Sequence, residues 1–203
     1  MATLAINLQK GQKIDLKKSD GSALTKVVIG LGWKTRGAGG GFLSSLFGGS
    51  DAEYDLDASV FLCRDGKLTD SGDIVYYGHL KHASGAVVHH GDNLVGGDGV
   101  EDDEQITVDL QRVPSEYDRL VFVVNIYKCR SRSQHFGQVH DAFMRVVDDR
   151  GAEFCRYNLT EKLDGQTAMV FGEVYRRNGE WRFSAVGQGT NDESIDDLAR
   201  RFK

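Results

Sequence analysis

Apolar and polar residues alternate with a period of two along most of this chain. Because successive side chains of a strand point to opposite faces, this period predicts β-strands. The clearest segments are residues 26–33, 56–63, 105–110, 119–127 and 139–147. Shorter segments of the same kind continue the series at residues 3–8, 13–16, 73–77, 87–89, 153–157, 167–175 and 181–186.

Turn signals separate these segments and indicate how the strands are connected. Asp20-Gly21, Asp65-Gly66 and Asn178-Gly179 each stand between two predicted strands, as in tight hairpins. The chain also holds 25 glycines against a single proline. Many short strands joined by such turns predict an all-β fold, an antiparallel β-sandwich, and 203 residues can form it as one domain over residues 1–203.

Two segments depart from the alternation. Residues 37–50 are rich in glycine and serine and enclose four large apolar residues between Phe42 and Phe47, which fits either a flexible surface insertion or a loop that docks on a partner. Residues 191–202 predict a short C-terminal amphipathic helix that packs on the sandwich through Ile195, Leu198 and its other apolar positions.

The chain also resembles itself. Four segments of the first half match four of the second, in the pairs 27–33 with 121–127, 55–62 with 139–146, 76–80 with 156–160, and 103–108 with 164–169. Two diverged repeats would pair into one sandwich. Where the first half carries residues 91–104, the second has only residues 162–165, so the fold does not require that longer stretch.

The stretch from Gly91 to Glu104 is the most acidic part of the chain. It contains six carboxylates, four glycines and no cation. Between Lys81 and Arg112 there are seven acids and no lysine or arginine, and subtracting these seven from the 30 acids leaves 23 against 25 bases. The net charge of -5 therefore comes from this region, and no broad basic face suggests a nucleic-acid partner.

The repulsion among these carboxylates can be relieved in two ways. It can extend into water as a solvated acidic loop, or it can fold around a cation that takes oxygen ligands. Asp55 and Asp57 stand two apart and would face one side of a strand, where they are either solvent-facing or close over the acidic loop. Eight carboxylates could then bind two calcium ions, whereas magnesium retains its waters and needs fewer. The spacing is not that of an EF-hand.

Other features bear on the cellular compartment of the protein and on the enzyme classes to which it could belong. Cys63, Cys129 and Cys155 are widely spaced and odd in number, which favours buried thiols in a reducing compartment. The chain shows no signal peptide and no long apolar run, so we expect a cytoplasmic protein without stable membrane insertion. The sequence contains no nucleophile elbow, P-loop or Rossmann fingerprint.

Some histidines and arginines allow more than one interpretation. His79, His82, His89 and His90 lack zinc-site spacing and are expected on strand surfaces. The arginines either form a modest basic surface or are solvated at strand edges; they are Arg130, Arg132, Arg145, Arg176 and Arg177.

Several of these stretches together resemble the tellurium-resistance TerD family, also called the stress-response calcium-binding TerD domain. The resemblance runs from about Leu4 to Gly189. It rests on DLDASVFL at 55–62, the GDN and DDE groups of the acidic stretch, FGQV at 136–139 and AVGQG at 185–189. One difference is that Val100-Glu101 lengthens the spacing between GDN and DDE by a residue.

The resemblance implies a non-enzymatic cytoplasmic protein of a bacterial tellurite-resistance and stress-response system that binds calcium, with other proteins of a stress-response complex as partners. The metal ligands that it implies are Asp55, Asp57, Asp92, Asn93, Asp98, Asp102, Asp103 and Glu104. In this reading calcium orders the acidic loop, which presents an interaction surface, although the partner surface could instead be residues 42–47. The alternative is a metal-dependent hydrolase of phosphate compounds that uses the same carboxylates.

Overall fold

The computed structural model describes residues 5–35, 55–92 and 102–203. The predicted insertion at residues 37–50 and most of the acidic loop therefore lie outside the described residues. Within the described part of the chain, no helix has the length and apolar character that a membrane crossing requires.

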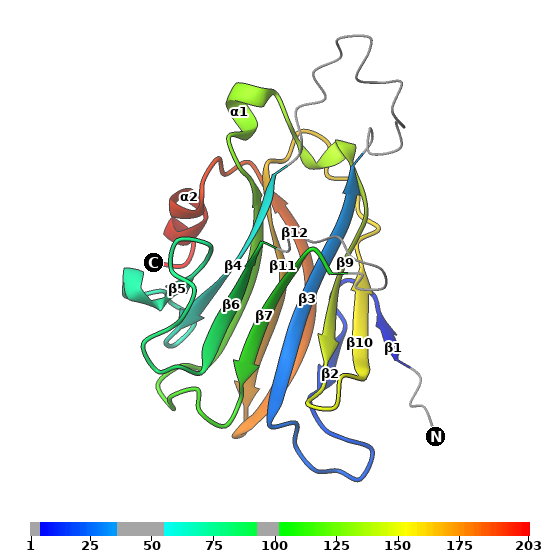
Figure 1. Ribbon diagram of the computed structural model, residues 1–203, viewed down its shortest axis with the longest axis vertical. Coiled ribbons are helices and arrows are strands. Elements are labelled where there is room, and N and C mark those ends of the chain that lie inside the picture. Colours follow the sequence, from blue (N-terminus) through cyan, green and yellow to red (C-terminus); the bar gives the residue numbers. More distant parts are fainter. Residues whose placement is uncertain (1–4, 36–54, 93–101) are drawn as a thin grey trace.

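The strands form two six-stranded sheets that face each other (Figure 1). The first, called here the β3 sheet, contains β1 (Ile6–Leu8), β10 (Glu153–Asn158), β9 (Val139–Val147), β3 (Lys26–Thr35), β7 (Glu104–Asp109) and β6 (Val87–Asp92), in that order. The second, the β8 sheet, contains β2 (Lys13–Asp15), β12 (Glu180–Thr190), β11 (Ala168–Arg177), β8 (Arg119–Ile126), β4 (Leu56–Cys63) and β5 (Ile74–Val75). Neighbours are antiparallel except for β1 and β10, which are parallel, so the predicted sandwich is confirmed.

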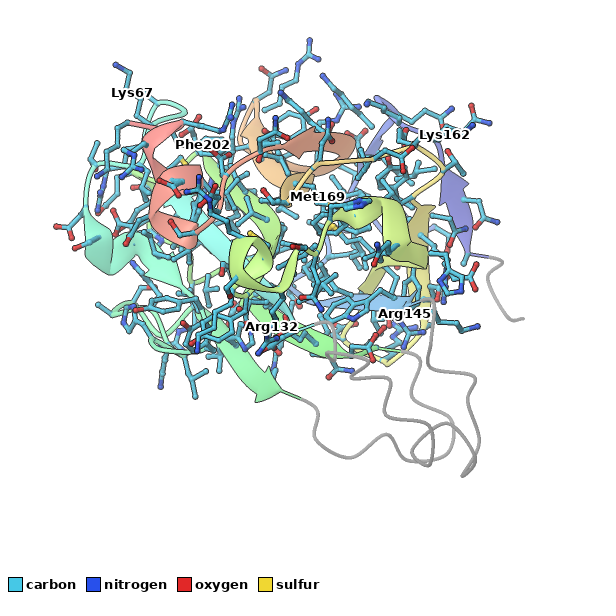
Figure 2. All side chains as sticks on the ribbon, turned by 90° about the horizontal axis from the view of Figure 1, so that it is seen from above. Lys67, Arg132, Arg145, Lys162, Met169 and Phe202 are labelled. Carbon is cyan, nitrogen blue, oxygen red and sulfur yellow. The ribbon has the colours of Figure 1, made fainter. Side chains whose placement is uncertain are left out.

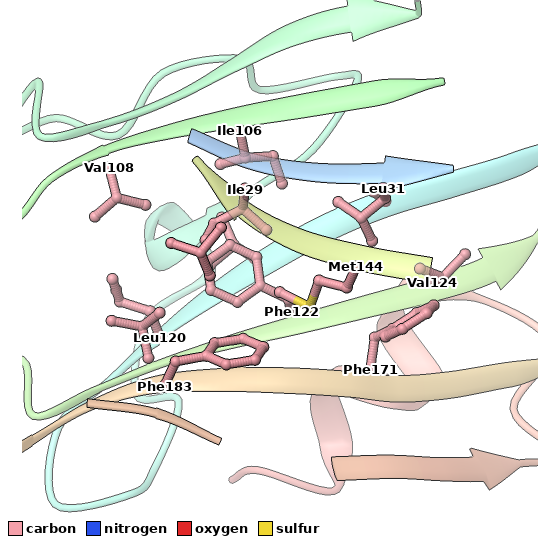
Figure 3. Packing of buried hydrophobic residues seen from close by; sticks show 14 of the residues in the cluster. Ile29, Leu31, Ile106, Val108, Leu120, Phe122, Val124, Met144, Phe171 and Phe183 are labelled. Atoms are coloured by element: carbon pink, nitrogen blue, oxygen red, sulfur yellow. The ribbon is translucent and has the colours of Figure 1, made fainter. Parts of the chain in front are cut away.

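The core lies between the inward faces of the two sheets. Figure 3 shows Ile29 and Ile106 on one side and Phe122 and Phe183 on the other, with Met144 between them. All five side chains are fully buried. Fully burying such a side chain stabilises the fold by about 1.5–3 kcal/mol, which is why the inward positions of the strands are apolar.

The sheet orders agree with the predicted repeat. Two of the matched pairs fall on β3 and β8 and on β4 and β9. In the other two, residues 76–80 directly follow β5 and residues 156–160 overlap β10, while residues 103–108 cover most of β7 and residues 164–169 run into the start of β11. The β3 sheet runs β10-β9-β3-β7 and the β8 sheet runs β5-β4-β8-β11, so each pair takes equivalent places. Each half also gives strands to both sheets, because β4 pairs with β8 and β9 pairs with β3.

Two short helices accompany the sheets. The predicted C-terminal helix is α2 (Ile195–Arg200), shorter than residues 191–202, because Ser194 acts as its N-cap and accepts from the backbone N–H of Asp197. Its apolar face packs on the outside of the β8 sheet against Phe61 and its neighbours, as predicted. The second helix, α1 (Cys129–Arg132), follows β8 and was not predicted.

The sandwich has two different ends. At the upper end in Figure 1, β4 begins beside the start of β7, and we call this the acidic end. At the opposite end, β3 and β12 begin where β7 ends, since Lys26 pairs with Asp109 and the Trp181 indole reaches Leu110.

Candidate cation site

The acidic end brings together strands from both sheets. β6 and β7 are antiparallel neighbours, and the backbone of Asp92 at the end of β6 pairs with Glu104 at the start of β7. β4 of the other sheet begins at Leu56, next to Asp55 and Asp57. Six of the eight predicted ligands thus lie within two residues of an end of β4, β6 or β7, namely Asp55, Asp57, Asp92, Asp102, Asp103 and Glu104.

Glu104 fastens the two sheets together at this end. Its buried carboxylate accepts from the backbone N–H of Ala58, with Oε2 2.5 Å from the nitrogen. His89 Nδ1 accepts from the N–H of Gly91 at 2.9 Å, so Nε2 carries the proton and donates to the Ala58 carbonyl at 3.1 Å. The same Nε2 lies 3.9 Å from Glu104 Oε1. β5 pairs with β4 only at Val60 and Phe61 and does not reach Ala58. Glu104 and His89 therefore supply the hydrogen-bond partners for the N–H and the carbonyl of Ala58.

Asp102 is held on the outer face of the β3 sheet. Arg145 on β9 donates to both of its carboxylate oxygens, from Nε at 2.7 Å and from Nη2 at 3.0 Å. Gln105 adds a hydrogen bond at 3.1 Å. The carboxylate lies directly over Gly30, where a Cβ would overlap it. Figure 2 shows the position of Arg145 as seen from the acidic end.

Asp103 extends outward beside the end of β3. Its Oδ2 accepts from the backbone N–H of Trp33 at 2.8 Å, and its own N–H donates to the Leu31 carbonyl. The side chain is exposed on one side, yet its surroundings remove part of its hydration, which raises its pKa. The Trp33 hydrogen bond lowers the pKa and the charge of Asp102 raises it again. A cation beside Asp103 would favour the ionised form.

Asp55 and Asp57 lie on the β8 sheet near two tyrosines. Asp57 is buried on the outer face of β4, opposite Asn125 in the register with β8. Burial raises the pKa of Tyr77, and the nearby charges of Asp57 and Asp55 raise it further. The Tyr77 ring is 54% exposed and meets Tyr76 edge-on. Both carboxylates therefore stand at an aromatic, partly open surface.

The described carboxylates do not form one cluster by themselves. Glu104 points toward the interior, Asp102 to the outside of the β3 sheet and Asp57 to the outside of the β8 sheet. Over residues 5–35, 55–92 and 102–203, no three metal-ligating side chains are close enough together to hold an ion. Asn93, Asp98 and the side chain of Asp92 lie outside the described residues, so the ligand set remains a prediction.

Two of the four clustered histidines are buried, contrary to the expected surface positions. His89 lies in the acidic end, and His82 lies in a separate network around Asp73. In that network Tyr117 donates to Asp73 at 2.6 Å and His82 Nε2 lies 3.3 Å from the same oxygen, while Arg64 pairs with the other oxygen at 2.5 Å. These side chains fill inward positions because each finds a partner, which residue spacing does not reveal.

The three thiols are buried, as predicted. Burial raises the pKa of Cys63 and of Cys155 to about 12. Since the thiolate is the reactive form, neither residue is suited to nucleophilic or redox chemistry.

The family model and the most similar known proteins point to the same family. Residues 4–202 match the TerD domain. The chain is 48% identical over 200 residues to stress response protein SCP2 of Bacillus subtilis, covering 98% of this chain and 100% of that one. It is 44% identical over 189 residues to tellurium resistance protein TerD of Serratia marcescens, covering 92% and 91%. A solved structure of a homologue of the telluride resistance protein from Streptomyces coelicolor superposes with a TM-score of 0.64 at 16% identity, covering 89% of this chain and 99% of that one. At this identity the likeness shows the fold alone.

Proposed function

The chain belongs to the TerD family, whose named members include tellurium-resistance and stress-response proteins, and from this premise we propose that it is a non-enzymatic calcium-binding protein. We place calcium at the acidic end and the protein in the cytoplasm. The ordered acidic loop would present a surface to other proteins of a stress-response complex.

The observation that carries this proposal is the contact between Glu104 and Ala58. It fixes the start of β7 in one sheet against the start of β4 in the other. Asp57 therefore lies one residue from a backbone group that Glu104 binds, and the backbone of Asp92 pairs with Glu104 itself. Carboxylate and amide oxygens from three chain segments are the ligand type that calcium prefers.

The geometry divides the predicted ligands into two groups. Asp102 and Glu104 already accept short hydrogen bonds from Arg145 and from Ala58, and we assign them the task of anchoring both sides of the site. Direct oxygen ligands would come from the others, namely Asp55, Asp57, Asp92, Asn93, Asp98 and Asp103. When bound, calcium would supply positive charge that offsets the repulsion among these carboxylates.

The adjoining surface supports a partner-binding role. Tyr77 and Leu80 are two of the exposed large apolar residues, 54% and 45% exposed, and Tyr77 stands beside Asp55 and Asp57. Aromatic side chains next to polar groups are enriched in protein interfaces. A loop ordered at this end would extend the same surface.

Calorimetric titration with calcium tests the site. The wild type is expected to bind two ions, and a variant with Asp57→Asn and Asp92→Asn is expected to lose at least about tenfold in affinity, because charged ligands are removed while their shape is kept. Asp196→Asn, on the exposed side of α2, is the control, because it makes the same kind of substitution away from the site and removes one of the two charges that the double variant removes.

Unchanged calcium affinity in the double variant would refute the assigned ligands. The hydrolase alternative is tested with the same proteins: calcium- or magnesium-dependent release of phosphate from a phosphate ester, abolished by the double variant, would show that the carboxylates perform catalysis instead.

A further inference from the structure

The end of the sandwich opposite the acidic end contains a hollow of about 700 Å³. It opens where the two sheets separate. Its walls come from the turn before β3, the segment that follows β7 and the β11–β12 hairpin. Among the residues that line it are Arg112, Arg176, Trp181, Gln111 and Ser115. No part of the proposed calcium site contributes to it.

Arg176 is one of the side chains that line this hollow. It lies two residues after the core residue Val174 on β11, so both side chains point to the inward face of the sheet. Its guanidinium lies over the ring of Trp181, 4.4 Å from the centroid, and Trp181 is its register partner on β12. Nη2 donates to the Val113 carbonyl at 2.7 Å. Trp181 is fixed in turn, because its indole N–H donates to the Leu110 carbonyl at 3.0 Å. The cation is thus held in one orientation before any ligand arrives.

This cation is not neutralised by the protein. Among the described residues, no carboxylate forms an ion pair with Arg176 or with Arg112, which also lines the hollow. Three acids close to these arginines in the fold have other partners: Asp109 accepts from the backbone N–H of Arg112, Glu180 pairs with Lys17 at 2.7 Å, and Asp118 accepts from the backbone N–H of Gly66. Burial lowers the pKa of Arg176, and no acidic neighbour raises it. A partly buried guanidinium without a counter-charge is normally avoided.

We propose that this hollow binds a small molecule carrying a phosphate group, with Arg176 and Arg112 as its cationic contacts. A guanidinium presents its N–H groups in a planar fork that matches two oxygens of a phosphate. Nη2 of Arg176 donates to backbone carbonyls, and within the described residues Nη1 makes no hydrogen bond, so we assign Nη1 to the anion. Arg112 also lines the hollow. Among the described residues its side chain makes a single hydrogen bond, a long one of 3.5 Å from Nη2 to the Ser84 carbonyl, so little holds its guanidinium away from an anion.

The volume of the hollow indicates a ligand larger than a free phosphate ion. Pockets for small molecules measure about 300–1,000 Å³, and a volume of about 700 Å³ leaves room for an organic group beside the phosphate. Polar side chains such as Gln111, Ser115 and Thr25 line the remaining wall, which suits hydroxyl groups such as those of a sugar.

Isothermal titration of the calcium-free protein with ribose 5-phosphate, inorganic phosphate and ribose tests this proposal. Ribose 5-phosphate is expected to bind with a Kd below about 1 mM, inorganic phosphate more weakly, and ribose not at all. Equal affinity for both phosphates would still assign the site but would make the free anion its ligand. The proposal is overturned if neither phosphate binds at up to about 10 mM.

Two variants locate the site. Arg176→Gln should weaken binding by at least about tenfold, because it removes a charged hydrogen-bond donor. Arg112 is exposed, so Arg112→Gln should leave the melting temperature unchanged and still weaken binding about threefold or more. It therefore keeps the test valid even if Arg176→Gln fails to fold. Arg177→Gln is the matched control: Arg177 is adjacent to Arg176 in sequence but exposed on the other side of β11, and equal weakening there would show nonspecific attraction.

Discussion

At the scale of single residues, Gly30 and Arg145 together determine where Asp102 lies. Gly30 faces outward from β3 and leaves the space that the carboxylate occupies, while Arg145 on the next strand binds both carboxylate oxygens. A glycine inside a strand costs conformational entropy and packs nothing. The close approach of the Asp102 carboxylate explains why a glycine stands at position 30 of this strand.

This arrangement predicts a strong coupling between the two positions. Gly30→Ala should destabilise the protein by about 1–3 kcal/mol, because the new methyl group displaces Asp102 from Arg145. In an Asp102→Ala background the same change should be nearly neutral, since the obstructing carboxylate is gone. Urea unfolding of the four proteins of this cycle, in chelator so that calcium plays no part, measures the coupling; equal costs in both backgrounds would contradict it.

The sequence could show the acids of this site but not their partners. Asp55, Asp57 and the DDE group stand out as a local concentration of charge. Arg145, however, is 43 positions from Asp102, and only the pairing of β9 with β3 brings them together. The anchoring roles that we propose for Asp102 and Glu104 rest on such tertiary contacts, so charge spacing alone assigned them the same function as their neighbours.

At the scale of elements, α2 completes the outside of the β8 sheet. Leu198 is fully buried in a cluster with Phe61, Val121 and Val123, and Phe202 meets Phe61 edge-on at 5.6 Å. The backbone N–H of Leu68 also donates to the Phe202 carbonyl at 2.6 Å. A helix of six residues is too short to be stable alone, so its docking face must hold it.

Truncating that face should therefore lower stability considerably. Leu198→Ala is expected to cost about 2–5 kcal/mol through lost burial and the resulting cavity. Asp196→Ala, on the exposed side of the same helix, should change the free energy of unfolding by less than about 0.5 kcal/mol. Chemical denaturation followed by circular dichroism compares them; similar values for both variants would show that α2 does not cover the sheet as described.

Strand prediction succeeded where one face of the strand is buried and failed where tertiary contacts decide. The bounds of β4 and β9 match the predicted residues 56–63 and 139–147. β5 is shorter than residues 73–77, because Asp73 is held by Arg64 and Tyr117, and Tyr76 bridges to His79. α1 is flanked by two non-glycine residues with positive φ, Lys128 and Ser133, and Lys128 forms no side-chain cap, so no sequence signal marked it.

At the scale of the whole molecule, the sandwich holds opposite charges at opposite ends. Acidic residues gather where β4, β6 and β7 meet, and the cationic hollow lies where β3 and β12 begin. A continuous cluster of buried apolar side chains lies between them. The fold therefore carries two candidate sites on one scaffold, and each can be altered without touching the other.

Calcium binding should be visible as stability of the entire fold. The proposed ligands come from both sheets, so an ion bound at the acidic end favours only the state in which β4 and β7 are in place. At a calcium concentration of 100 times Kd, binding adds about 2.7 kcal/mol to the free energy of unfolding. For a chain of this length that corresponds to a rise in melting temperature of roughly 5–10 °C.

Thermal unfolding with calcium and with chelator measures this rise. The Asp57→Asn and Asp92→Asn double variant should show a rise no more than about half as large at the same calcium concentration, because tenfold weaker binding adds only about 1.4 kcal/mol. The Arg176→Gln variant should retain the full calcium-dependent shift, since its substitution lies at the opposite end. An undiminished calcium shift in the double variant would place the ion elsewhere, and loss of the shift in Arg176→Gln would contradict the independence of the two ends.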